Sequence, residues 1–223
     1  MIDEFKNQDK FDTKKATQNN YNKMSKWYDL FGSFENRFRR KGLQLLNVSS
    51  AEKILEIGSG TGRSINDISK KLDQTGMIHG IDLSNKMISK ASNRAIKRKY
   101  SDRAYFICGD AEHLPYNSNI FDGIFISFTI ELFEDQEISQ ILNECKRVLK
   151  HEGRICIVTL SRRKVNCMVK IYEKLHKKMP KIIDCRPIRI DDYLQRTNML
   201  IHTTKQMMMW GLPVDIVIAI KNG

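Results

Sequence analysis

The chain has 223 residues, of which 41% are hydrophobic and 29% are charged, and its formal net charge is +12. This length predicts one globular domain with an elaboration, because domains average roughly 100–200 residues. No run of about 18 apolar residues occurs, which excludes a membrane-spanning helix. The N-terminal segment is polar, so we expect no secretory signal. The five cysteines include no C-x-x-C pair, which is typical of reduced thiols in a cytoplasmic protein and not of a zinc site.

The positive charge is concentrated in one part of the chain. Between Lys150 and Ile190 there are twelve Lys or Arg residues and only three Asp or Glu residues. Such a stretch is either a solvated basic face or a surface that attracts nucleic acid or anionic membrane lipid. Charge alone does not separate these interpretations.

Amphipathic and aromatic sequence comes first, from about Lys14 to Val48. It predicts one or two helices, so we expect a helical extension over residues 1–50, packed on a domain that spans residues 51–223. In that domain, short apolar segments alternate with amphipathic ones, which predicts a Rossmann-like, mostly parallel α/β sheet with helices on both faces. The seven expected strands are Lys53–Ile57, Met77–Ile81, Ala104–Cys108, Phe121–Phe128, Gly153–Leu160, His202–Met209 and Asp215–Ile220.

The regular alternation is interrupted late in the chain. An apolar stripe predicts a helix over residues 135–150, which ends at His151-Glu152-Gly153. Residues 162–196 then break the rhythm and are expected to form a partly helical insertion that covers the site. In the strand that follows, alternate side chains point to opposite faces. We therefore expect Met207 and Met209 to pack in the core and Met208 to point away from it.

The strongest motif is LEIGSGTGRS, in which an apolar strand runs into Gly58, Gly60 and Gly62. Glycines allow a tight turn and a close approach of the backbone to a ligand. A dinucleotide-binding fingerprint would carry its third glycine at position 63, where this chain has Arg63. The spacing thus argues against an NAD-dependent oxidoreductase. Glu56, two residues before the first glycine, suits the ammonium group of an amino acid better than a pyrophosphate.

Polar groups also follow the next expected strands. Asp82 closes the second strand, where a carboxylate can accept hydrogen bonds from both hydroxyls of a ribose. Met87 follows, either as a thioether against an adenine face or as plain helix core. Asp110 with Ala111 follows the third strand, and Ser127 ends the fourth. Together these strand ends suit one ligand that contains adenosine and an amino acid.

These segments resemble class I S-adenosylmethionine methyltransferases, in particular the ubiquinone/menaquinone biosynthesis C-methyltransferase group. The resemblance runs from about Tyr21 to Ile220 and is carried by LEIGSGTGRS, GIDLSNKMISKA, CGDAEHLPYNSNIFDGIFISF and LNECKRVLKHEGRICIV. It implies a seven-stranded sheet with an antiparallel last strand, and S-adenosylmethionine as cofactor. The cofactor-binding set that it implies is Tyr21, Glu56, Gly58, Ser59, Gly60, Thr61, Asp82, Leu83, Met87, Asp110, Ala111 and Ser127.

The sequence departs from that group on the acceptor side. Methyltransferases of quinone rings usually carry Arg-Asn shortly after the Ser-Phe pair, whereas this chain has Glu131 and Leu132. The resemblance therefore implies methyl transfer but does not name a quinone as the substrate. Candidates for a base are Glu131, His113 and Tyr28. Glu131 is better explained as a solvent-exposed helix cap and His113 as an ordinary loop residue, so we assign no catalytic residue. No motif for a metal ion is present.

Three functions fit the sequence. Methylation of a small or lipid-like acceptor, such as a quinone-type ring, is favoured because the insertion and the N-terminal helices would wall a pocket. RNA methylation is supported by the charge, but no N/D-P-P-Y/F motif follows the fourth strand, where Ser127-Phe128-Thr129-Ile130 stands. A non-catalytic protein that binds S-adenosylmethionine would need the same glycines and carboxylates. The acceptor and the oligomeric state are not predicted.

Overall fold

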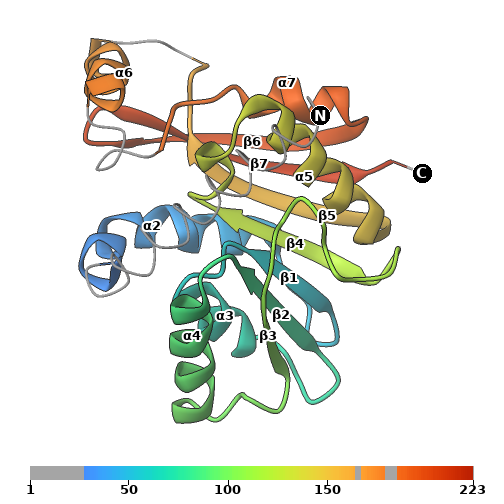
Figure 1. Cartoon of the computed structure of the whole chain (residues 1–223). Coiled ribbons are helices and arrows are strands. Elements are labelled where there is room, and N and C mark those ends of the chain that lie inside the picture. The colour runs from blue at the N-terminus through green and yellow to red at the C-terminus, as the bar shows by residue number, and fades with distance from the viewer. Residues whose placement is uncertain (1–27, 164–166, 179–184, 223) are drawn as a thin grey trace, which may run out of the picture.

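A computed structural model describes residues 28–163, 167–178 and 185–222 of the chain (Figure 1). The seven strands are β1 (Lys53–Ile57), β2 (Met77–Asp82), β3 (Ala104–Cys108), β4 (Phe121–Ser127), β5 (Leu149–Leu160), β6 (Met199–Met209) and β7 (Leu212–Lys221). The helices are α2 (Tyr28–Leu46), α3 (Arg63–Ser69), α4 (Asn85–Lys97), α5 (Asp135–Val148), α6 (Cys167–Lys178) and α7 (Ile190–Arg196), with a 3₁₀ turn η1 (Ile130–Leu132).

All seven strands join one sheet in the order β3-β2-β1-β4-β5-β7-β6. β7 is antiparallel to both of its neighbours, and the pairs from β3 across to β5 are parallel. The predicted fold, with its antiparallel last strand, is confirmed. The strand order reverses between β1 and β4, so the carboxyl ends of these strands form the crevice where ligands of open α/β sheets bind.

Helices cover both faces of this sheet (Figure 1). On one face, α2, α3 and α4 enclose a core that includes Phe38, Ile65 and Phe125. On the other, α5 and α7 enclose a second core around Ile141 and Leu194. This second core contains the apolar stripe that the sequence predicted between β4 and β5, including the fully buried Ile138, Leu142, Cys145 and Val148. No helix in the described residues is long and apolar enough to cross a membrane.

Three strands begin earlier than predicted. β5 begins at Leu149, not Gly153, and the preceding helix ends at Val148. Leu149 pairs with Phe121, and a register shift follows before Gly123. The polar residues Lys150 to Glu152 therefore belong to a strand, although their sequence reads as the end of a helix. β6 and β7 likewise begin three residues earlier than expected, at Met199 and Leu212.

Two separate helices occur in the expected insertion over residues 162–196. α7 packs against α5 and β6, and α6 lies beside the hairpin turn between β6 and β7 (Figure 1). The boundary proposed at residue 50 stays a prediction.

Candidate functional site

The glycine-rich loop lies between the end of β1 and the start of α3. Its backbone is tied to β2, because the N–H groups of Gly58 and Ser59 both donate to the Ile81 carbonyl, at 2.9 and 3.1 Å. Gly58, Gly60 and Gly62 all have positive φ angles, between 51° and 74°. Residues other than glycine rarely adopt this backbone conformation. The loop is thus a tight turn that holds its backbone at the carboxyl edge of the sheet.

Asp82, at the end of β2, links two segments of this edge. One carboxylate oxygen accepts from Gly60 N at 2.8 Å, and the other accepts from Ser84 N at 2.9 Å. Burial raises the pKa of Asp82, and the two N–H donors oppose that shift. Each carboxylate oxygen can accept a second hydrogen bond. Asp82 can therefore brace the loop and still accept from ribose hydroxyls.

Glu56, near the end of β1, is the buried carboxylate of the site. It is 3% exposed and accepts hydrogen bonds from the Ser64 side chain and the Ile65 backbone N–H. Burial raises the pKa of Glu56 to about 8. Among the described residues, its Oε2 and the Ser59 Oγ have no hydrogen-bond partner. A buried carboxylate with a free oxygen fits a cationic ligand group, because a nearby positive charge restores the ionised form. The amino group of S-adenosylmethionine is such a cation.

A cavity joins this loop to the start of α2. It is lined by Glu35, Arg39, Glu56, Gly58, Ser59, Gly60, Thr61, Arg63, Ser64 and Ser127. Six of the predicted cofactor residues, including Ser127 of β4, thus come together around one cavity. None of the described residues of the 162–196 segment lines this cavity, and the expected cover over the site stays a prediction.

The remaining predicted residues lie along the same edge of the sheet. Asp110 follows β3 and accepts from Glu112 N at 3.0 Å, next to the buried Ala111. Leu83 is half-buried, and Met87 is buried in the first turn of α4, a position that suits both of its interpretations. Tyr21 and the side chain of Tyr28 lie outside the described residues. The roles of this set in cofactor binding stay predictions.

Two arginines at the loop were missed by sequence reasoning. Arg94 of α4 donates to the Thr61 hydroxyl at 3.0 Å and also to the Thr61 carbonyl. Arg39 of α2 forms an ion pair with Asp67 at 2.8 Å. Its positive charge partly opposes the rise that burial causes in the pKa of Glu56. Both arginines lie on helices whose apolar residues dominate the pattern. Their positions next to the loop depend on helix packing, which no local spacing indicates.

Glu131 is fully buried at 0% exposure, so its interpretation as an exposed cap is wrong. It lies in η1 after β4, where Oε1 accepts from Leu160 N of β5 at 3.2 Å, and Oε2 has no partner among the described residues. Burial raises the pKa of Glu131 to about 8. At pH 7 the carboxyl group is therefore mostly protonated and is a poor base.

The buried Glu131 should make stability fall as the pH rises. Because its pKa is higher in the folded state, its stabilising contribution is complete below pH 4.5 and is lost as the pH rises through about 8. Glu131→Gln removes this titration. We expect the free energy of unfolding of the variant, relative to wild type, to increase by on the order of 3 kcal/mol between pH 5 and pH 9. Urea unfolding at both pH values measures it, and parallel curves for the two proteins would contradict the burial of this carboxyl.

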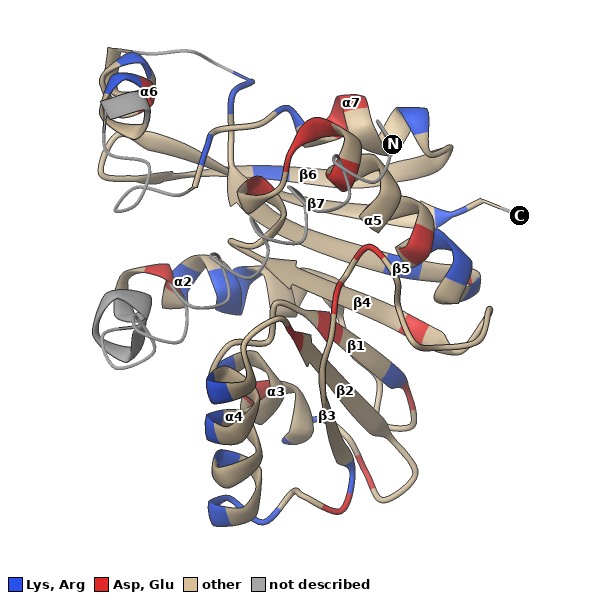
Figure 2. Cartoon of the chain, viewed as in Figure 1, with Lys and Arg blue, Asp and Glu red and all other residues tan. Residues whose placement is uncertain are grey.

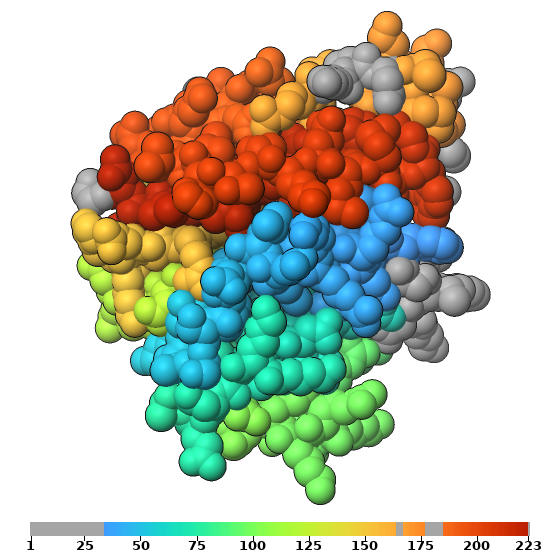
Figure 3. Space-filling view, turned by 180° about the vertical axis from the view of Figure 1, so that it is seen from behind, coloured from blue at the N-terminus to red at the C-terminus, as the bar shows by residue number. Residues whose placement is uncertain are grey.

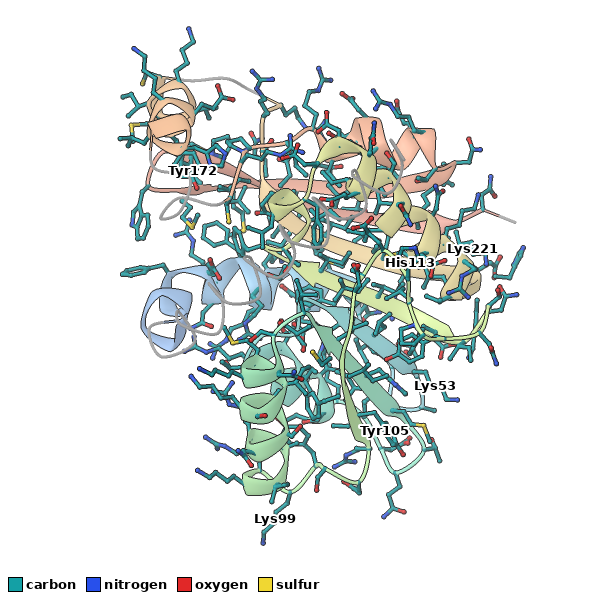
Figure 4. All side chains as sticks on the ribbon, viewed as in Figure 1. Lys53, Lys99, Tyr105, His113, Tyr172 and Lys221 are labelled. Atoms are coloured by element: carbon teal, nitrogen blue, oxygen red, sulfur yellow. The ribbon has the colours of Figure 1, made fainter. Side chains whose placement is uncertain are left out.

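His113 and His79 differ in their surroundings. His113 is exposed and lies 3.1 Å from the Gln140 side-chain nitrogen, which is the ordinary loop position that the sequence allowed (Figure 4). His79 of β2 stacks on Tyr105, and burial lowers its pKa to about 4. Neither histidine lines the cavity at the loop.

Comparison with protein families decides the assignment. The model of the ubiE/COQ5 methyltransferase family matches residues 4–194. The chain belongs to this family. The membership confirms the predicted family, and with it S-adenosylmethionine as the cofactor.

Curated relatives agree with this membership. The chain is 31% identical to the demethylmenaquinone methyltransferase of Thermotoga maritima over 153 residues, which is 66% of this chain and 63% of that protein. It is 30% identical to the ubiquinone/menaquinone biosynthesis C-methyltransferase UbiE of Pseudomonas putida over 65% of this chain and 56% of that protein. The chain thus matches less than two thirds of the length of these relatives.

A solved structure supports the fold of this chain. The geranyl diphosphate C-methyltransferase of Streptomyces coelicolor, in complex with S-adenosyl-L-homocysteine, superposes with a TM-score of 0.70. The superposition covers 84% of this chain and 76% of that chain, at 12% identity. At this identity the likeness concerns the fold alone.

Proposed function

We propose that the chain transfers the methyl group of S-adenosylmethionine to a small or lipid-like acceptor with a quinone-type ring. The observation that carries the proposal is the meeting of Glu56, the Gly58–Gly62 loop and Asp82 at the switch point of the sheet. The names of the relatives, which concern demethylmenaquinone, ubiquinone and menaquinone, support the acceptor class.

In the proposed complex, each strand end holds one part of the cofactor. Glu56 and the loop bind the methionine end, with Ser127 beside it, and Asp82 binds the ribose. Asp110, Ala111 and the neighbouring Leu83 and Met87 hold the adenine. The free Oε2 of Glu56 supports this arrangement, because an ammonium group placed there would favour the ionised form of a buried carboxyl group that is otherwise mostly protonated at pH 7.

Methyl transfer requires little from the protein beyond the positioning of the acceptor relative to the cofactor. S-adenosylmethionine supplies an electrophilic methyl group on a sulfur that leaves as a neutral thioether. The chain must hold the acceptor in line behind that methyl, and orientation of this kind can lower a barrier by about 7–11 kcal/mol. After a ring carbon of the acceptor attacks the methyl group, that carbon must also lose a proton. Since Glu131 replaces the Arg-Asn pair of quinone-ring methyltransferases and is mostly protonated at pH 7, we assign this step to no residue.

Two measurements test the proposal. Calorimetric titration should give micromolar binding of S-adenosylmethionine and S-adenosylhomocysteine and no binding of NAD. Incubation with methyl-labelled cofactor and a demethylated quinone should then place the label in the lipid-soluble product. Absence of adenosyl binding would overturn the proposal at its base. Binding without transfer to the quinone would favour a non-catalytic binder, and label in added RNA would favour the RNA methyltransferase.

A further inference from the structure

Large apolar side chains are exposed at one corner of the molecule. Nine of them are exposed in the described residues, and six belong to three adjacent elements. We call these six the hairpin-tip patch: Phe34 of α2, Met168, Ile171 and Leu175 of α6, and Met208 and Trp210 at the turn between β6 and β7. Single exposed apolar residues need no explanation, but a cluster of this kind marks an interaction site.

Contacts between the three elements make the patch continuous. The rings of Phe34 and Trp210 meet edge to face, with centroids 4.7 Å apart. Next to Trp210, a Cβ built on Gly211 would lie 2.9 Å from Met168 Cγ, so α6 packs directly on the turn. Figure 3 shows the described part of α2 beside the strands of the hairpin, with α6 above them. Trp210 stays 66% exposed despite these contacts.

α6 presents two different faces. Val169 is buried and Tyr172 packs against the core under the helix, toward the sheet in Figure 4. Met168, Ile171 and Leu175, at the spacing of one helical stripe, are exposed on the outside. Lys170 and Lys174 are exposed beside this stripe. An apolar stripe next to lysines is the surface of a helix that lies in a membrane interface.

Met208 extends the same surface onto the hairpin. Met207 and Met209 are half-buried and pack against the core, and Met208 is 46% exposed on the other face, as the sequence predicted. Arg37 donates a hydrogen bond to the Met208 carbonyl, which adds a cation to the edge of the patch. Aromatic and cationic side chains together suit the level of the lipid headgroups.

We propose that the hairpin-tip patch docks this protein on an anionic lipid bilayer. The charge fits, because the chain carries +12 and the lysines of α6 border the patch (Figure 2). The position fits as well. β6 runs parallel to β5. Its last residue, Met209, therefore lies at the end of the sheet where the parallel strands terminate, as does the glycine-rich loop after β1. Docking there turns the site toward the membrane. The link to acceptor delivery rests on the proposed function, since a lipid-like quinone resides in the bilayer.

Flotation with phosphatidylcholine vesicles, with and without phosphatidylglycerol, tests the docking. We expect wild type to float only with the anionic vesicles. Ile171→Ser should weaken vesicle binding by about tenfold, since it removes one apolar side chain that the proposed docking buries in the bilayer. The matched control is Ile96→Ser, which changes another exposed isoleucine, on α4, a helix that also carries lysines but lies outside the patch. Equal loss in both variants, or none in either, would overturn the proposal.

A spectroscopic readout follows the same contact. The chain has two tryptophans, so Trp27→Phe leaves Trp210 as the sole reporter. Its emission should shift to shorter wavelength when anionic vesicles are added and stay unchanged with neutral ones. No shift, or a shift produced by an RNA oligomer instead, would overturn membrane docking. Titration with S-adenosylmethionine on the same samples keeps this outcome separate from the proposed function, because no residue of the patch lines the cofactor cavity.

Discussion

Replacing Asp82 by alanine is expected to weaken the binding of S-adenosylmethionine by about 100-fold or more, because it removes charge-assisted hydrogen bonds worth about 1.5–3 kcal/mol each. Two of these bonds brace the site from within, to Gly60 N and Ser84 N. The others are the proposed bonds to the ribose. Calorimetric titration measures the loss for both S-adenosylmethionine and S-adenosylhomocysteine.

Asp122 offers a matched control for that variant. It lies near the start of β4, at the opposite end of the sheet, and accepts from Lys53 N at 2.8 Å and from the Lys150 ammonium at 2.7 Å. Asp122→Ala should therefore cost folding stability, as Asp82→Ala does, but leave cofactor affinity unchanged. If Asp82→Ala binds the cofactor as tightly as wild type, the assignment of the ribose site to the end of β2 is wrong.

Two glycine variants of the same loop should separate folding from binding. At Gly58, with φ of +68°, an added Cβ would lie 2.3 Å from Thr129 Oγ1. Gly58→Ala combines this clash with backbone strain, so we expect it to lower the free energy of unfolding by about 3 kcal/mol or more. At Gly60, with φ of +51°, an added Cβ meets nothing within 4 Å. Gly60→Ala should cost only about 1–2 kcal/mol.

The small loss of stability in Gly60→Ala should be accompanied by a clear loss of cofactor affinity. In folded Gly60→Ala, the new methyl group would stand in the proposed path of the ligand to the backbone, and we expect S-adenosylmethionine to bind at least about tenfold more weakly. Urea unfolding and calorimetric titration on each variant measure both quantities. Adding Thr129→Ala to Gly58→Ala should recover part of the lost stability. A Gly60→Ala protein with normal stability and normal affinity would show that the cofactor does not approach this part of the loop.

The parts of the fold that repeat with a fixed period were predictable from the sequence. The apolar stripe of α5 has such a period, and the strand before the glycines is a short, continuously buried run; both appear where expected. β5 was placed four residues late because Lys150, His151 and Glu152 look like the end of a helix. Pairing with β4 across a register shift, which is a tertiary effect, puts them in a strand.

The site could be predicted where strand ends carry it and not where helices do. Glu56 and Asp82 follow directly from their strands, and both lie at the glycine-rich loop. Glu131 was misjudged because charged residues are rarely buried and a single 3₁₀ turn has no period. Arg39 reaches the cavity only through the packing of α2 on the sheet, and no motif records that packing.

The two edges of the sheet differ in how they resist pairing with another chain. Among the described strands, β3 ends the sheet with five residues and β6 ends it with eleven. A long free edge invites a second strand, which is a route to aggregation. In β6, a register shift between Ile201 and Thr203 interrupts a flat surface, and the exposed Lys205 follows it. Bulges and edge lysines oppose strand addition, so these two features disfavour the pairing of another strand with the longer edge of this sheet.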